Sequence, residues 1–217
     1  MLLHISDAQA LLRGGAFLID TRPTADFING FITKSLHLPM GERFEEYATL
    51  IITPEDTVVV IAQPGQEEQV YGAMAKTGFI NIKGIVAGGY DSLVASGMAT
   101  DVLIAIDIDE FEIDYKFDEF YLIDIRNEVQ YDLAHIEHAE NIPLADLSTT
   151  ITAMNNSSIY YLYGATAEEA IVAAAICKQY DIHLLRAVEA SFDQIEQSNI
   201  PITHQKKVQA DNSFSAN

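Results

Sequence analysis

Short apolar runs alternate with amphipathic stretches along this chain, a pattern typical of βα units around a mostly parallel sheet. Near the start, Ser6 and Gln9 have the spacing of a capping box and predict a helix over residues 7–12, which ends at Gly14-Gly15. An apolar strand, Phe17–Asp20, follows this helix. The same reasoning predicts further helices over residues 67–76 and 167–179, and further strands over residues 83–86 and 183–187.

The middle of the chain suggests a division into two domains. Residues 104–114 alternate apolar and acidic side chains, as a half-exposed strand or an extended linker would. We therefore expect a boundary near Thr100-Asp101, between a first domain of residues 1–100 and a second domain of residues 101–203. The polar segment 204–217 predicts a disordered tail.

The two halves of the chain are related by an internal repeat. The segment Leu18–Arg22, which reads Leu-Ile-Asp-Thr-Arg, recurs as Leu122–Arg126, at an offset of 124 − 20 = 104 residues. Two copies of one α/β domain are the simplest explanation. Later matches are Val58–Ile61 with Ile159–Leu162 and Glu67-Glu68 with Glu168-Glu169, both at an offset of 168 − 67 = 101, and Tyr90-Asp91 with Phe192-Asp193, at 192 − 90 = 102.

Charge and hydropathy exclude several classes of partner. The 217 residues include 32 Asp and Glu against 12 Lys and Arg, a net charge of −20, and such a surface repels nucleic acid and anionic lipid. No apolar run approaches the roughly 20 residues of a membrane span, since even Ile171–Cys177 is short. Residues 1–7 do not resemble a signal peptide, and the single cysteine cannot form an internal disulfide. We expect a cytoplasmic protein.

Both copies carry motifs that resemble the signature of the rhodanese-like family. In the first copy these are Asp20, Arg22, Asp26-Phe27, Gly30, Ile32 and Leu38-Pro39. In the second they are Asp124, Arg126, Tyr131, His135-Ile136, Ala139 and Asn141–Pro143. The resemblance extends to about Ile202 and implies an α/β fold of two tandem rhodanese-like domains, each with a mostly parallel central sheet flanked by helices.

The loop that carries the chemistry of this family is altered in both copies. In the family, a cysteine opens a six-residue turn that ends in Arg or Lys, and the turn leads into a helix. Here the resemblance places Ala62 and Tyr163 at the nucleophile position, and Glu67 and Glu168 where the cation would be. A carboxylate beside an incoming dianion opposes sulfur transfer. The loop residues that remain as a ligand or partner site are Gln63, Gly65, Gln66, Glu67, Gly164, Ala165, Thr166 and Glu168.

The other conspicuous residues have structural interpretations. Cys177 lies in an apolar helical stretch and is expected to be a buried core thiol, not a displaced nucleophile. The histidines are too scattered for a metal site, and no motif implies a cofactor. The resemblance implies that the pairs Asp20/Arg22 and Asp124/Arg126 are structural ion pairs.

Two functions follow from these observations. The first is a catalytically silent module that binds or regulates another protein. The chain also resembles the rhodanese part of fusions with a metallo-β-lactamase-fold persulfide dioxygenase, which implies a role beside such an enzyme in sulfur metabolism. The alternative is a sulfurtransferase that acts on thiosulfate or a persulfide and uses a thiol supplied by a partner or a small molecule.

Overall fold

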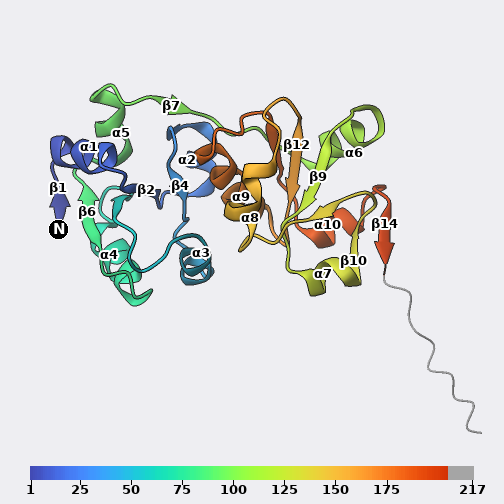
Figure 1. Cartoon of the computed structure of the whole chain (residues 1–217), viewed down its shortest axis with the longest axis horizontal. Coiled ribbons are helices and arrows are strands. Elements are labelled where there is room, and N and C mark those ends of the chain that lie inside the picture. The colour runs from blue at the N-terminus through green and yellow to red at the C-terminus, as the bar shows by residue number, and fades with distance from the viewer. Residues whose placement is uncertain (205–217) are drawn as a thin grey trace, which may run out of the picture.

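The chain folds into two α/β units of the same topology, arranged one after the other along the long axis of the molecule (Figure 1). The computed structural model describes residues 1–204. Each unit contains a five-stranded parallel sheet with helices around it, so the predicted fold class is confirmed.

The first unit is built on a sheet with the strand order β1-β6-β5-β2-β4. Strand β5 consists of four buried apolar residues, as expected for the centre of a parallel sheet. The strands of this sheet are β1 (Leu2–Leu3), β2 (Phe17–Asp20), β4 (Leu36–His37), β5 (Val58–Ile61) and β6 (Ile82–Val86). The helices are α1 (Ile5–Arg13), α2 (Thr24–Asn29), α3 (Phe44–Ile51), α4 (Glu67–Lys76) and α5 (Gly89–Ala95).

The second unit repeats this order as β8-β13-β12-β9-β11. Its strands are β8 (Ala105–Ile106), β9 (Tyr121–Asp124), β11 (Glu140–Asn141), β12 (Tyr160–Tyr163) and β13 (Leu185–Val188). Its helices are α6 (Ile108–Phe117), α7 (Glu128–Leu133), α8 (Leu147–Thr150), the 3₁₀ turn η1 (Ile151–Ala153), α9 (Ala167–Gln179) and α10 (Phe192–Glu196).

A short antiparallel pair completes each unit. In the first, β3 (Phe31–Ile32) pairs with β7 (Thr100–Asp101), so the predicted boundary falls on a strand that returns to the first unit. In the second, β10 (Ala134–Ile136) pairs with β14 (Ile202–His204). His204, expected to open a disordered tail, is therefore a strand residue, and the rest of that expectation, residues 205–217, lies outside the described residues.

The interpretation of residues 104–114 as a strand or linker is wrong. Only Ala105–Ile106 is a strand, and α6 follows directly. The Asp107 carboxylate caps this helix by accepting a hydrogen bond of 2.9 Å from the Glu110 N–H. Phe111 is buried and Tyr115, four residues later, packs against the same core, which is helical spacing.

The first helix also begins differently from its prediction. It starts at Ile5 with His4 as N-cap, because the His4 imidazole accepts a hydrogen bond from the Ser6 N–H, whereas the prediction made the Ser6 side chain the cap, accepting from the Gln9 N–H. Its end at Gly14 and the bounds of α4 and α9 agree with the sequence pattern.

Helix α9 lies between the two sheets and belongs to the cores of both units (Figure 1). Ten consecutive residues of α9, from Glu169 to Lys178, are buried. A helix that is apolar on every face needs a partner on every face, and α9 packs on β12 and β13 of its own unit and on β4 and α2 of the first. A single apolar cluster consequently joins residues such as Ile19 and Leu36 to Ala174 and Ile176.

Candidate functional site

The sheet register identifies which loop residues of the two copies correspond. Asp20 pairs with Ile61 across β2 and β5, and Asp124 pairs with Tyr163 across β9 and β12. Since Asp20 and Asp124 are equivalent, Tyr163 corresponds to Ile61, and the residue equivalent to Ala62 is Gly164.

The alignment of Ala62 with Tyr163 is therefore displaced by one residue. With the corrected offset of 163 − 61 = 102, Glu67 is equivalent to Glu169 and not to Glu168. The sequence contains a signal for this alignment, because an offset of 102 holds without a gap from β5 and β12 to the matched pairs Tyr90-Asp91 and Phe192-Asp193. This offset would have identified Glu169.

Tyr163 is a core residue and not part of the loop surface. Its side chain is fully buried, and its ring lies parallel to that of Phe192, with centroids 6.1 Å apart. Its hydroxyl accepts a hydrogen bond of 3.1 Å from the Ile136 N–H. Burial and the nearby Asp124 carboxylate raise the pKa of Tyr163, so this phenol remains protonated and closes the end of β12.

The first loop, Ala62–Gln66, is an open turn in front of α4. The Gln66 N–H donates to the Gln63 carbonyl at 3.0 Å, and Gly65 has a φ of +86°, which favours glycine. The Gln63 side-chain amide donates to the Asp26 carboxylate at 3.1 Å. Ala62 itself is nearly fully buried and presents only a methyl group.

A cavity of about 350 Å³ lies in front of the first loop. Its one cation, Arg22, already donates to Asp20 at 2.6 Å and to the Gly30 carbonyl at 2.7 Å, and it stacks on the Tyr90 ring at 3.8 Å. The carboxylates of Asp26 and Asp91 also line this cavity, which makes it unfavourable for an anion. The complete lining is Arg22, Asp26, Asn29, Gly30, Ala62, Gln63, Pro64, Gly88, Tyr90 and Asp91.

The two Asp/Arg pairs have the same geometry. Arg126 donates to both carboxylate oxygens of Asp124 and to the Ala134 carbonyl at 2.7 Å, as Arg22 does with Asp20 and Gly30. All four charged side chains are buried. Each pair therefore ties the end of a central strand to the turn that follows α2 or α7.

The second loop, Gly164–Thr166, is occupied by a carboxylate of the chain itself. Oε2 of Glu169 accepts a hydrogen bond of 2.7 Å from the Ala165 N–H, and the Glu169 side chain is only 8% exposed. A Cβ on Gly164 would lie 2.8 Å from this oxygen, so the arrangement requires glycine there. The backbone amide that would face a bound anion is thereby already engaged.

A shorter loop explains why Glu169 can reach this amide. The Thr166 hydroxyl accepts a hydrogen bond from the Glu169 N–H at 3.2 Å and caps α9, which begins at Ala167. In the first copy the residue equivalent to Ala167 is Gly65, where the turn still continues. The earlier start of α9 places Glu169 within its first turn.

Arg43 of the first unit neutralises this buried carboxylate. Its guanidinium lies 3.2 Å from Oε1 of Glu169 and 2.7 Å from Glu46, and it stacks on the Tyr47 ring at 4.6 Å. Arg43 donates hydrogen bonds to the Glu46 carboxylate and thereby lowers the pKa of the Glu46 carboxyl. Partial burial raises the pKa of the neighbouring Glu168 carboxyl. The second loop therefore faces the first unit.

Cys177 is sealed within the core, as predicted. It is fully buried, and burial raises its pKa to about 12. Its thiol is consequently protonated at neutral pH and inert as a nucleophile. Within residues 1–204, no three His, Cys, Asp or Glu side chains are grouped closely enough to hold a metal ion.

The sequence model of the Rhodanese-like domain matches this chain twice, over residues 4–96 and 108–198. The chain belongs to the rhodanese-like family. A search of the curated proteins found no match. No helix in the described part of this rhodanese-like chain is long and apolar enough to cross a membrane.

Several solved structures are similar to this rhodanese-like chain. They include a rhodanese-like domain from Anabaena (17% identity, TM-score 0.44, covering 52% of this chain and 89% of that one) and a protein from Bacillus halodurans (20%, 0.43, 47% and 77%). The thiosulfate sulfurtransferase of Pseudomonas aeruginosa matches with 12% identity and a TM-score of 0.40, over 94% of this chain and 44% of its own length.

Replacing Glu169 with Gln tests the internal carboxylate. Glu169→Gln replaces the carboxylate that accepts a hydrogen bond from the Ala165 N–H and pairs with Arg43. We therefore expect the free energy of unfolding, measured by urea denaturation, to fall by about 1–3 kcal/mol. The matched variant Glu67→Gln, at the more exposed equivalent position, is expected to cost less than about 1 kcal/mol. Equal losses for the two variants would contradict this account of the second loop.

Proposed function

We propose that this protein is a catalytically silent tandem rhodanese-like module that binds another protein. The observation that carries the proposal is the Glu169 carboxylate on the Ala165 amide, because it occupies the place where the second loop would bind an anion. Sulfur transfer also needs a thiolate. Ala62 and Gly164 carry no nucleophile, and the single thiol, Cys177, is buried and protonated.

The first loop is the better candidate for partner contact. Pro64 and Gly65 of this loop are exposed, whereas in the second loop Gly164 is buried and Ala165 and Thr166 are only half-exposed. Asp26 and Asp91 give its cavity a negative rim, and Gln63 adds an amide. A lysine or arginine side chain of a partner protein complements this chemistry. The resemblance to fusions with persulfide dioxygenases makes a separate enzyme of that type the first partner to test.

Catalytic silence is tested by restoring the missing groups in the full-length chain. We expect the wild type to show no turnover in a thiosulfate:cyanide assay, and Ala62→Cys alone to stay about 10²–10³-fold below the double variant Ala62→Cys/Glu67→Arg, since an electrostatic donor at a reacting anion contributes about that factor. Equal rates for the single and double variants would show that Glu67 does not oppose the chemistry. Wild-type turnover would overturn the proposal. Turnover that Cys177→Ser abolishes would identify Cys177 as the nucleophile, whereas turnover that survives Cys177→Ser would support the sulfurtransferase alternative, which takes its thiol from elsewhere.

Partner binding is tested by biolayer interferometry with a purified persulfide dioxygenase. Removing two rim charges with Asp26→Asn/Asp91→Asn is expected to weaken binding about fivefold, a typical contribution of exposed charge pairs. The control Asp109→Asn/Asp132→Asn makes the same change in net charge on the second unit and should leave the affinity unchanged. No binding by the wild type, or equal weakening by both double variants, would exclude this enzyme at this loop.

A further inference from the structure

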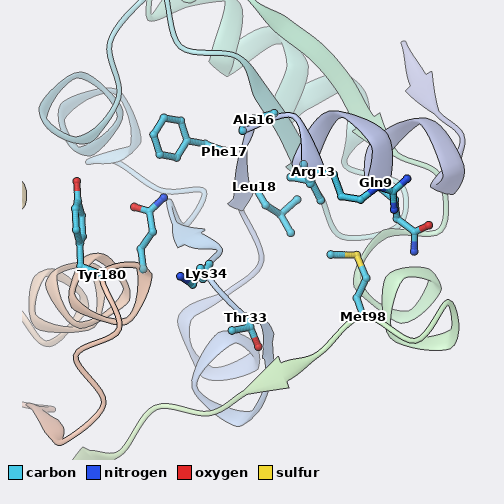
Figure 2. Close-up of a pocket in the computed structure, with 12 residues that line it drawn as sticks. Gln9, Arg13, Ala16, Phe17, Leu18, Thr33, Lys34, Met98 and Tyr180 are labelled. Carbon is cyan, nitrogen blue, oxygen red and sulfur yellow. The ribbon is translucent and has the colours of Figure 1, made fainter. Parts of the chain in front are cut away.

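A cavity of about 610 Å³ lies away from both loops (Figure 2). It opens beside Phe17, the first residue of β2, whereas the loops follow the carboxyl ends of β5 and β12. The first unit provides α1, the start of β2 and the turn after β3, and the second provides the end of α9. Its volume lies within the roughly 300–1,000 Å³ of typical small-molecule sites.

The walls of this cavity are mainly apolar. Leu12, Phe17, Leu18 and Met98 come from the first unit, and the Tyr180 ring comes from the second. Figure 2 shows the Phe17 and Tyr180 rings on one side of the cavity and Met98 on the other. Such walls gain free energy by covering the apolar body of a ligand.

The charged residues of the lining are both cationic, although the chain as a whole carries a net charge of −20. They are Arg13, at the end of α1, and Lys34. Among the residues described, no carboxylate lies within ion-pair distance of Arg13, whereas Lys34 pairs with Asp181 at 2.9 Å across the two units. In the view of Figure 2, Arg13 lies at the end of the cavity away from Tyr180, and Lys34 lies between them.

The backbone holds Lys34 in an uncommon conformation. Its φ of +68° lies in the left-handed region, which few residues other than glycine adopt. The turn that contains it connects β3 to β4, and the Ser35 N–H donates to the Ile32 carbonyl at 2.9 Å. A tight turn therefore fixes the backbone of Lys34, and the last turn of α1 fixes the backbone of Arg13.

We propose that this cavity binds a small organic carboxylate with an aromatic or aliphatic body. The carboxylate pairs with Arg13, whose guanidinium can donate two parallel hydrogen bonds, and the apolar body lies among Phe17, Leu18 and Met98. Because residues of both units line the cavity, such a ligand also bridges them. This site is independent of the proposed function of the loops.

The test uses the full-length protein labelled with ¹³C at the methionine methyl groups and titrated with 4-phenylbutyrate. Met98 lines the cavity, whereas Met74 lies in the core of the first unit and Met154 packs in the second, so these two are internal controls. We expect a saturable shift of the Met98 methyl signal alone. Removing the paired cation with Arg13→Gln is expected to weaken binding about tenfold.

Two matched controls separate the proposed site from nonspecific binding. The neutral 4-phenylbutyramide should bind about tenfold more weakly than the acid, and Lys116→Gln, which removes a cation on α6 of the second unit, should leave the affinity unchanged. The proposal is overturned if Met98 does not shift at millimolar ligand, if the amide binds as well as the acid, or if Arg13→Gln and Lys116→Gln have the same effect.

Discussion

The burial of α9 on all of its faces is the constraint on which the rest of this structure depends. Its interior is rich in alanine, and small side chains allow close approach to β12 and β13 on one side and to β4 and α2 on the other. The equivalent helix of the first copy, α4, buries only Val70 and Met74 and leaves its polar side in water. The duplicated units are therefore alike in topology and different in packing, and one helix supplies part of both cores.

The closed second loop follows from the same helix. Because α9 starts immediately after Thr166, Glu169 lies one turn from the loop and its carboxylate reaches the Ala165 amide. A buried carboxylate without a partner lowers the stability of the fold. Arg43 of the first unit pairs with Glu169, and α9 packs directly on that unit. The first loop, opened by Pro64 and Gly65, has no such internal anion and stays accessible. The loop of the first copy is thus exposed to solvent, whereas the loop of the second copy lies beside Arg43 of the first unit.

Local patterns in the sequence were sufficient for much of the fold. The apolar run of β5 and the bounds of α4 and α9 follow from hydrophobicity and helix ends, and the repeated Asp-x-Arg segments indicate the family. The alternation of Ile104, Ile106 and Ile108 imitates a strand, and only the capping residue Asp107 indicates that a helix starts there. The equivalence of Gly164 and Ala62 needs a comparison of the two copies at an offset of 102 residues, which the pairing across the sheets establishes. The contact of Arg43 with Glu169 spans 126 residues, so no local pattern predicts it.

The shared core is tested most directly by native-state hydrogen exchange of the wild type and of Ala174→Leu, which overfills the buried α9. If α9 belongs to both cores, the substitution should lower the free energy of amide opening in β5 and in β12 by the same amount, about 1–3 kcal/mol. Loss of protection in β12 with unchanged protection in β5 would show that the first unit folds without α9, which contradicts the account.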